Sequence, residues 1–280
     1  MNKPLLQVKN LGLSLPDMAH KSLFVPAPLK RIFSHISFEL QAGSSLGVIG
    51  ESGSGKSTLA RALILIMQPH EGEMLFRGES VLDFNEQQRI NYRSQLQMIF
   101  QDPMSSLNPR RRISDIIAQP LQVRGHDVND ADRLDKVMQL LRRVGLNSSL
   151  ASRYPHQLSG GQRQRVGIAR ALALQPVALI ADEVTSGLDV SAQARIVALL
   201  QALRREEGLA LIFISHDLSL VRSLCDNVLI LRQGEVMEQG AAAQIFSQPR
   251  HAYTRDLMDA IALPEPDEGW LERGQTTAGA

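Results

Sequence analysis

Hydrophobic and polar residues alternate in two ways along the chain, and each indicates a kind of strand. Leu5–Leu15 and Ile32–Leu40 alternate apolar and polar positions, which is typical of strands with one buried face. Leu46–Ile49, Val177–Ala181 and Ala210–Ser215 are short and almost entirely apolar, and each lies next to a helical pattern. Strands of this second kind are covered on both faces, as in a parallel sheet. The pattern predicts an α/β core preceded by a small antiparallel sheet.

The middle of the chain changes to a helical period. Between Pro103 and Pro155 apolar positions recur at helical spacing, most clearly over Asp130–Val144. No segment there alternates in the way of a strand, and polar turns separate the helical stretches. We therefore expect a helical subdomain inserted into the α/β core at about residues 103–165.

The C-terminal part of the chain begins with a predicted hairpin. Its strands are Val228–Leu231 and Glu235–Glu238, with Gln233 and Gly234 at the turn. A helical tail follows, and the last residues, from Pro264, are rich in Pro, Glu and Gly, a composition typical of disorder. This predicts one large domain over residues 1–262 and a disordered tail over residues 263–280.

Composition restricts the partners that we expect. The 280 residues are 44% hydrophobic and 21% charged, with a formal net charge of +1, as in ordinary globular chains. Proteins that bind nucleic acid usually carry a concentrated basic face, so nucleic acid is not expected as a partner. The single cysteine, Cys225, allows no intrachain disulfide or cysteine-ligated metal, fits a reducing cytosol, and is expected to be a small buried apolar residue.

Neither a secretory signal nor a membrane-spanning segment is expected. Met1–Leu15 lacks a continuous apolar core that ends at a small-residue cleavage site. The longest apolar stretches, Leu59–Met67 and Leu209–Ile214, are well below the about 20 residues of a membrane-spanning helix. Any association with a membrane is therefore expected to occur through partners.

A glycine-rich loop directly follows the apolar run Leu46–Ile49 and predicts a phosphate site. Its glycines let the backbone approach an anion closely, the following helix start adds positive potential, and Lys56 adds a charge at the outer phosphates. Ser57 would hold Mg²⁺. The alternative is a glycine-rich turn with an incidental lysine, but the strand, loop and helix context favours the phosphate site. The residues expected at the nucleotide are Gly50, Ser52, Gly53, Gly55, Lys56, Ser57 and Thr58.

Two carboxylates follow the apolar run Val177–Ala181. The carboxyl ends of strands are where α/β sheets bind ligands. There Asp182 would orient Mg²⁺, directly or through water, and Glu183 would accept a proton from the water that attacks the γ-phosphate. An exposed acidic loop is the alternative. A phosphate loop in the same chain favours the catalytic interpretation, because its metal site needs such a carboxylate.

A second anion site is predicted at Leu158–Gln162, just before the helical segment Arg163–Leu174. Ser159, Gly160 and Gly161 expose backbone N–H groups at a helix start, which suits a phosphate. It is not obvious how one nucleotide could bind to both the phosphate loop and this second site of the same chain. If this site completes the nucleotide pocket of a neighbouring chain, two ATP molecules would hold together a head-to-tail dimer.

In this order the motifs resemble those of the nucleotide-binding subunits of ATP-binding-cassette (ABC) transporters. The resemblance extends from Gly50 to His216. It identifies Gly50–Thr58 as the Walker A loop, Gln101 as the Q-loop glutamine, Leu158–Gln162 as the signature, Asp182 and Glu183 as the end of Walker B, Ser186–Asp189 as the D-loop and His216 as the switch histidine.

The resemblance implies a fold, two ligands and a set of roles. The fold is that of a P-loop NTPase with a RecA-like core, an N-terminal antiparallel β subdomain and an inserted helical subdomain, and the ligands are ATP and Mg²⁺. The implied catalytic residues are Glu183, His216, Gln101 and Lys56. The implied metal-site residues are Ser57, Gln101 and Asp182. The residues implied at a neighbouring chain's nucleotide are Ser159, Gly160, Gly161, Gln162 and Asp189.

Two further stretches narrow the resemblance. Ile99–Pro109 and the tail His251–Arg255 resemble the oligopeptide and dipeptide importer ATPases of bacteria. The implied partners are two transmembrane permease subunits, an extracytoplasmic substrate-binding protein and a second, identical or homologous ATPase. The implied location is the cytoplasmic face of the bacterial inner membrane, as a peripheral subunit. Nickel or metallophore uptake, antimicrobial-peptide uptake and a soluble non-transport ABC ATPase are the alternatives.

The chain departs from the family pattern at a few positions. Val184 and Ala252 stand where proline is usual, and Gly187 stands where alanine is common, but none of these changes removes a catalytic group. Phe24 and Ile32 are the two candidates for the contact with adenine. The arginines are interpreted as solvated charge, with contact to the permease as an alternative for the first three. These arginines are Arg110, Arg111, Arg112, Arg163, Arg165 and Arg170.

Overall fold

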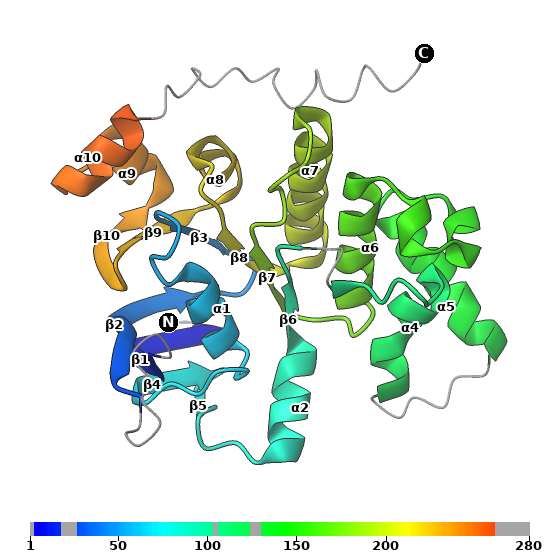
Figure 1. Cartoon of the computed structure of the whole chain (residues 1–280), viewed down its shortest axis with the longest axis horizontal. Helices are drawn as coiled ribbons and strands as arrows, with labels where there is room; N and C mark the ends of the chain where they lie inside the picture. Colours follow the sequence, from blue (N-terminus) through cyan, green and yellow to red (C-terminus); the bar gives the residue numbers. More distant parts are fainter. Residues whose placement is uncertain (1–2, 18–26, 103–105, 124–129, 261–280) are drawn as a thin grey trace. The chain divides into compact units, whose positions relative to one another are not determined.

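The computed structural model describes residues 3–17, 27–102, 106–123 and 130–260, which form two compact units. The first unit contains the described residues of Met1–Arg93 and Ala210–Leu263, and the second those of Ser94–Leu209. Figure 1 labels their elements along the chain. Phe24 and the predicted tail, residues 263–280, lie outside the described residues.

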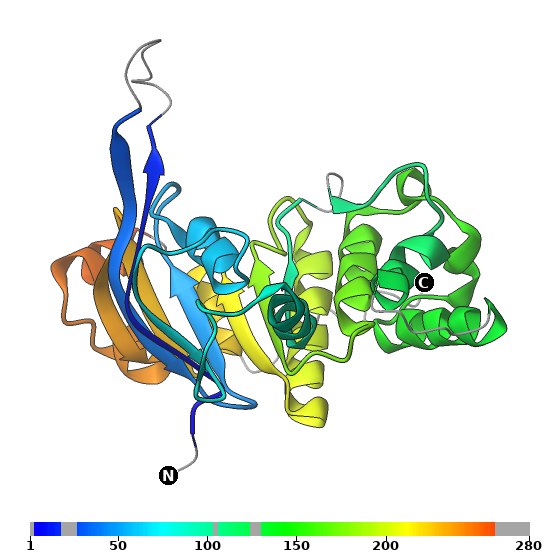
Figure 2. The ribbon, with the colours of Figure 1, turned by 90° about the horizontal axis from the view of Figure 1, so that it is seen from below.

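The first unit contains an antiparallel sheet built around the N-terminal strand. Strands β1 and β2 pair from Leu6 with Leu40 to Pro16 with Leu29, and they run side by side in Figure 2, so the predicted antiparallel pair is confirmed. The sequence patterns did not indicate β4 and β5, because β5 consists of two exposed residues and β4 is exposed over its first half. The order is β2-β1-β4-β5, with β1 Leu6–Pro16, β2 Leu29–Leu40, β4 Glu71–Phe76 and β5 Glu79–Ser80.

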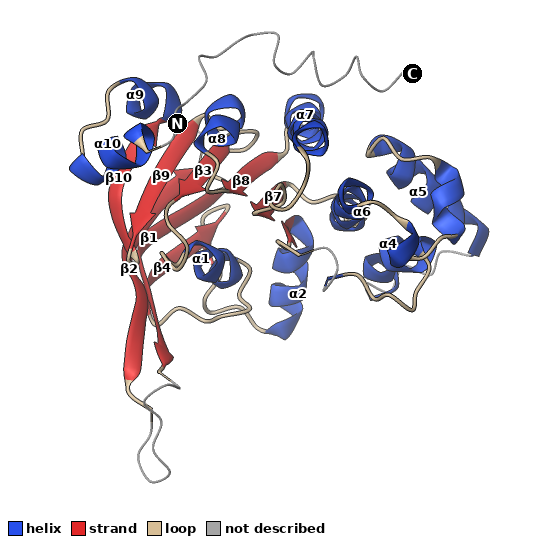
Figure 3. Ribbon diagram, turned by 45° about the horizontal axis from the view of Figure 1, so that its top comes forward, coloured by secondary structure: helices blue, strands red, loops and turns tan. Residues whose placement is uncertain are grey.

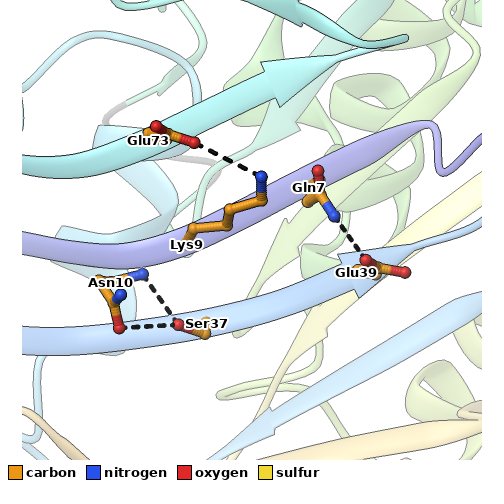
Figure 4. Close-up of polar contacts among 6 residues, drawn as sticks. All are labelled: Gln7, Lys9, Asn10, Ser37, Glu39 and Glu73. Carbon is orange, nitrogen blue, oxygen red and sulfur yellow. Dashed lines mark hydrogen bonds and ion pairs between the residues drawn. The ribbon is translucent and has the colours of Figure 1, made fainter.

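Polar side chains pair across the exposed face of this sheet (Figure 4). Such pairs each contribute well below about 1 kcal/mol, but together they favour one register over its neighbours. The opposite face carries the buried residues Leu6, Val8 and Ile36. The pairs in Figure 4 are Gln7 with Glu39 at 2.6 Å, Lys9 with Glu73 at 3.5 Å, and the Asn10 amide with Ser37 at 2.8 Å.

A mixed sheet forms the core of the first unit. In it β9, β3 and β8 are parallel neighbours, and β10 lies antiparallel to β9. All five residues of β3 and of β8 are buried, which confirms the predicted apolar central strands, and the predicted hairpin is β9 with β10. The bounds are β3 Ser45–Ile49, β8 Ala210–Ile214, β9 Asn227–Arg232 and β10 Glu235–Ala241.

Helices cover this mixed sheet, with α8 packed on β3 and α9 on β9 and β10 (Figure 1). Cys225, at the end of α8, is buried as expected. Earlier in the chain, α2 contains the boundary between the two units, with Arg93 in the first and Ser94 in the second. The helices are α1 Lys56–Leu63, α2 Glu86–Gln95, α8 Leu218–Leu224, α9 Ala242–Ser247 and α10 Ala252–Asp259.

Gly234 is required by the close packing of the β9–β10 turn. Both turn residues have positive φ, 50° at Gln233 and 84° at Gly234, as in the tight turns that match strand twist. A Cβ at Gly234 would lie 2.2 Å from the Ile32 carbonyl oxygen of β2. The β4–β5 turn has the same pattern, with φ 53° at Arg77 and 88° at Gly78, but a Cβ at Gly78 would meet only the end of the Lys3 side chain, at 3.6 Å.

This difference predicts unequal costs for the same substitution. Gly78→Ala should lower the free energy of unfolding by about 1 kcal/mol, the cost of an alanine in left-handed backbone. Gly234→Ala should lower it by about 3 kcal/mol, because the methyl group also forces β2 and the turn apart. Urea unfolding of the two variants measures both values, and equal losses would contradict the structural explanation.

The second unit combines a parallel strand pair with a group of helices. Strand β7 confirms the predicted apolar strand, whereas β6, which pairs with it in parallel, had no sequence-based prediction. The helix predicted over Asp130–Val144 is α5, and α4, α5 and α6 pack against one another (Figure 3). The elements are β6 Leu96–Ile99, β7 Ala178–Asp182, α4 Ile113–Val123, α5 Asp130–Arg143, α6 Gly160–Leu172 and α7 Val190–Glu207.

The predicted helical insert, about residues 103–165, falls within this second unit. Its described part contains α4, α5, the start of α6 and two short 3₁₀ segments, Ser148–Ser152 and Pro155–Gln157. Among the described residues, no helix has both the length and the apolar character needed to cross a membrane.

Candidate functional site

The predicted phosphate loop connects β3 to α1 in the first unit. The chain leaves the buried strand at Ile49 and enters α1 at Lys56, and the residue that caps the helix, Gly55, has φ 101°. At Gly50 a Cβ would lie 2.1 Å from the Leu231 carbonyl oxygen. Glycine is therefore required at both ends of the loop, by conformation at Gly55 and by the close approach of β9 at Gly50.

Lys56 is 4% exposed and its ammonium group is folded back onto the loop that precedes it. Nζ donates hydrogen bonds to the Gly50 and Glu51 carbonyl oxygens, each at 2.7 Å, and to Ser54 Oγ at 3.4 Å. The loop thus surrounds a buried positive charge. Ser57 and Thr58 follow in the first turn of α1.

The loop is supported by two neighbouring segments of the first unit. The Gly234 amide in the β9–β10 turn donates to the Ser54 carbonyl oxygen at 3.1 Å, and the Ser34 amide of β2 donates to the Gly234 carbonyl oxygen at 3.0 Å. Ile32, one of the two candidates for the adenine contact, is half-buried beside the loop, with its Cγ2 3.8 Å from a Cβ built at Gly55. The loop is therefore held by residues from β2 and from the β9–β10 turn.

His216 lies at the edge of the mixed sheet from which the phosphate loop also starts. Val48 of β3 pairs with Ile214 of β8 in parallel register, and the Ser215 amide donates to the Val48 carbonyl oxygen at 3.3 Å. His216 and Gly50 each come two residues after that pair, so both lie beyond the carboxyl ends of adjacent strands. The His216 side chain is exposed there.

The carboxylates predicted for catalysis lie at the end of β7 in the second unit. Asp182, the last residue of the strand, is 2% exposed. Glu183 follows with φ 47°, a left-handed conformation that is uncommon for glutamate and marks a sharp change of direction. Gln101 Nε2 donates to Glu183 Oε2 at 2.7 Å.

The register of β6 and β7 explains why Gln101 and Glu183 meet. Ile99 pairs with Ala181 in parallel, and each of the two side chains comes two residues further along its strand. Parallel strands bring equivalent positions to the same edge of a sheet. The sequence alone gave no sign of this hydrogen bond, because the strand pattern of β6 is too short to be recognised.

The signature segment starts α6 with reciprocal capping bonds. Ser159 Oγ accepts from the Gln162 amide at 3.3 Å, and the Ser159 amide donates to Gln162 Oε1 at 2.9 Å. Cβ atoms added at Gly160 and Gly161 would lie 3.1 Å from Leu188 Cδ2 and Ala192 Cβ. The two glycines therefore allow α6 to approach the start of α7 closely.

A pocket of about 160 Å³ lies between the starts of α6 and α7. Asp189 caps α7, and its carboxylate accepts from Ser191 Oγ at 2.6 Å and from the Ala192 amide at 2.9 Å. These bonds, the Ser191 bond foremost, lower the pKa of Asp189 and keep it charged. The lining residues are Ser159, Gly160, Gly161, Arg165, Gly187, Leu188, Asp189, Ala192 and Arg195.

The arginines of α6 are half-buried and hydrogen-bonded to backbone carbonyls, rather than fully solvated as the sequence led us to expect. Arg163 Nη1 donates to the Leu158 carbonyl oxygen at 2.7 Å, and Arg170 Nη1 donates to the Ser106 carbonyl oxygen at 2.6 Å. Burial lowers the pKa of Arg165, and the neighbouring charge of Arg195 lowers it further. The second unit thus presents two guanidinium groups at the signature pocket, which suits an anion.

A buried strand, a glycine loop and a buried lysine at a helix start define the class of P-loop nucleotide hydrolases. The cassette branch of that class would also require a helix start that is capped by a serine and followed by glycines, as in α6, and a strand that ends in two carboxylates, as in β7.

Comparison with known proteins agrees with this class. The sequence model described as ABC transporter matches residues 33–186. The chain is 46% identical over 274 residues to the oligopeptide transport ATP-binding protein OppF of Haemophilus influenzae, covering 97% of this chain and 81% of that protein. It is 41% identical over 268 residues to the dipeptide transport ATP-binding protein DppF of Escherichia coli, covering 96% and 79%.

A solved structure is also similar. The dimeric ATP-binding cassette MJ0796, in a post-hydrolysis state bound to ADP and Pi, matches with a TM-score of 0.74 and 26% identity, covering 85% of this chain and 98% of that one. The chain belongs to the ABC transporter family, as an ATP-binding subunit that hydrolyses ATP.

Proposed function

We propose that this chain supplies the energy of ATP hydrolysis to the import of dipeptides or oligopeptides. The observation that carries the proposal is the 41–46% identity, over nearly the whole chain, to ATP-binding proteins of oligopeptide and dipeptide transport. The similarity includes the C-terminal region, where the tail motif His251–Arg255 forms the start of α10.

ATP would bind through the first unit. The amides of Gly50–Thr58 would surround the β- and γ-phosphates, and Lys56 would exchange its carbonyl partners for phosphate oxygens. His216, exposed beyond β8, would donate a hydrogen bond to the γ-phosphate. Ile32 would contact the adenine from the edge of the loop.

The residues proposed for Mg²⁺ are Ser57, Asp182 and Gln101, which offer a hydroxyl, a carboxylate and an amide oxygen. This set fits the preference of Mg²⁺ for hard oxygen ligands. Asp182 is 2% exposed, and a buried carboxylate favours a nearby cation. The Gln101 amide nitrogen is used by Glu183, which leaves its oxygen as an acceptor. When bound, Mg²⁺ would neutralise charge on the outer phosphates.

Glu183 is the proposed general base. Gln101 Nε2 donates a hydrogen bond to its carboxylate at 2.7 Å, and a carboxylate held in this way is a group that can accept a proton from water. Ser159, Gly160, Gly161, Gln162 and Asp189 would complete the ATP site of a second cassette, so that two nucleotides lie between two subunits. The basic character that Arg165 and Arg195 give to this pocket favours such a phosphate.

An ATP-binding subunit of this family acts with membrane permease subunits. We propose two of them, a second ATPase and an extracytoplasmic peptide-binding protein. The chain would lie at the cytoplasmic face of the bacterial inner membrane as a peripheral subunit. Closure of the two cassettes on ATP would then be converted into alternating access of the permease pair.

The partner composition can be tested by affinity purification from native membranes. Tagged Glu183→Gln chain, purified with ATP, should carry two permeases, a second ATPase and a peptide-binding protein, identified by mass spectrometry. A parallel sample carrying Glu207→Gln, the same chemical change in the surface ion pair with Arg143, controls for the substitution itself. A nickel- or metallophore-binding protein in place of the peptide-binding protein would support the alternative substrates. Ribosomal or DNA-repair proteins alone would contradict the role in transport.

A further inference from the structure

The C-terminal helix α10 places a buried tyrosine next to the phosphate loop, within the first unit. Tyr253 is 5% exposed, and its hydroxyl has no partner of full hydrogen-bond geometry. The carboxylate and the amide of Glu51, the second residue of the loop, nevertheless lie close enough to act on it. Burial, and then the Glu51 carboxylate, raise the pKa of Tyr253. A tyrosine hydroxyl is protonated at neutral pH, and because a carboxylate only accepts hydrogen bonds, the hydroxyl can act only as a donor toward Glu51.

The ring of Tyr253 is fixed by Arg232, the last residue of β9. The guanidinium carbon of Arg232 lies 4.6 Å from the ring centroid, within the range of a cation–π contact. The same end of β9 touches the loop through Leu231, whose carbonyl oxygen packs on Gly50, and leads into the turn that donates to Ser54. One strand end thus supports both the tyrosine and the loop.

The start of α10 is anchored to the sheet. Glu238 of β10 accepts hydrogen bonds from the amides of Arg250, at 2.9 Å, and His251, at 3.0 Å. His251 caps the helix, with its Nδ1 accepting from the Tyr253 amide at 3.2 Å. These hydrogen bonds hold the start of α10, and Tyr253 with it, on the sheet.

A buried hydroxyl without a proper partner is costly, and a small movement of Glu51 would remove the cost. In this structure the Glu51 carbonyl oxygen is held by Lys56 Nζ at 2.7 Å, while the Glu51 side chain is exposed. Phosphate oxygens are stronger acceptors for an ammonium group than backbone carbonyls. Binding of ATP would therefore release Glu51 from Lys56.

We propose that Tyr253 is a positioning residue of the nucleotide site. Once the phosphates of ATP replace the loop carbonyls as the partners of Lys56, the Tyr253 hydroxyl donates a hydrogen bond to the Glu51 carboxylate. This bond fixes the start of the loop and holds the negative side chain of Glu51 away from the phosphates. The C-terminal helix then contributes directly to the affinity for ATP. The inference rests on the proposed binding of ATP at Gly50–Thr58.

The test removes only the hydroxyl. Tyr253→Phe in the full chain should weaken the Kd for ATP with Mg²⁺, measured by titration calorimetry, by about tenfold, the typical value of a hydrogen bond to a charged group. The KM for ATP should rise by the same factor while kcat stays within about twofold. Thr254→Val is the matched control, because it removes the next hydroxyl of α10, which is also buried without a standard partner but acts on Glu238. Its Kd should equal that of the wild type.

A double-substitution cycle separates positioning from a general effect on packing. Glu51→Ala removes the acceptor at an exposed side chain and should not disturb folding. In that background Tyr253→Phe should change the Kd less than about twofold, because the partner is gone. Wild-type affinity in Tyr253→Phe, an equal loss in both backgrounds, or the same loss in Thr254→Val would overturn the inference. Wild-type chain that fails to bind ATP, or unchanged affinity in Lys56→Ala, would instead overturn the proposed nucleotide site.

Discussion

Glu183→Gln is expected to lower kcat for ATP hydrolysis at least about 100-fold, the lower range for loss of a general base. The substitution keeps the shape of the side chain, and glutamine Oε1 can still accept the hydrogen bond that Gln101 Nε2 donates at 2.7 Å. The left-handed backbone at residue 183, with φ 47°, is equally compatible with glutamine. The Kd for ATP should therefore be as tight as in the wild type, because only the proton acceptor is lost. Steady-state turnover and equilibrium ATP binding measure the two quantities.

Glu207→Gln is the matched control for this prediction. It makes the same chemical change in the same unit, at an exposed glutamate whose carboxylate accepts a hydrogen bond from Arg143 Nε at 2.6 Å. Its kcat should stay within about twofold of the wild type. Substantial hydrolysis retained by Glu183→Gln would remove Glu183 from the role of base.

Lys56→Ala is expected to weaken ATP binding by about 10- to 100-fold, the range for loss of a hydrogen bond between charged groups. The ammonium group is the buried positive charge of the loop, and it is poised on the Gly50 and Glu51 carbonyl oxygens. Because the lysine is expected to act on the outer phosphates, the loss should be much smaller for AMP than for ATP. Titration calorimetry with both nucleotides gives the comparison.

The substitution at Lys56 also removes the donor for two loop carbonyls, so stability must be followed together with affinity. Thermal unfolding without nucleotide reports any loss of structure, and Lys9→Ala, at the exposed pair with Glu73, provides a lysine control that should bind ATP normally. Equal losses for AMP and ATP would indicate a damaged loop and contradict a specific role at the outer phosphates. An unchanged Kd for ATP would contradict the assignment altogether.

The elements that the sequence predicted are those whose signal is local and strong. The central strands β3, β7 and β8 are buried at every residue, and apolar runs of that kind are recognisable without any partner. The hairpin of β9 and β10 was predicted from two turn residues, Gln233 and Gly234, both of which have positive φ.

The elements without a prediction carry weaker patterns. Helix α2 is largely polar, and β6 has four residues, too few for a periodicity to be counted. Sequence analysis also failed for the arginines of α6, because an arginine is normally predicted to be an exposed charge. Arg170 is instead bound to the Ser106 carbonyl oxygen, and only the path of the backbone around it makes that burial possible.

The sequence by itself determined the family and the motifs, because a phosphate loop, a capped helix start and a strand that ends in two carboxylates are each formed by consecutive residues. Backbone N–H groups and neighbouring side chains of such segments are placed by local geometry alone. Only the tertiary structure decided which distant residues meet. The register of β6 and β7 joins Gln101 to Glu183, and the packing of α10 and β9 brings Tyr253 to Glu51. Such contacts depend on how the elements pack against one another, and no local pattern of hydrophobic and polar residues encodes that packing.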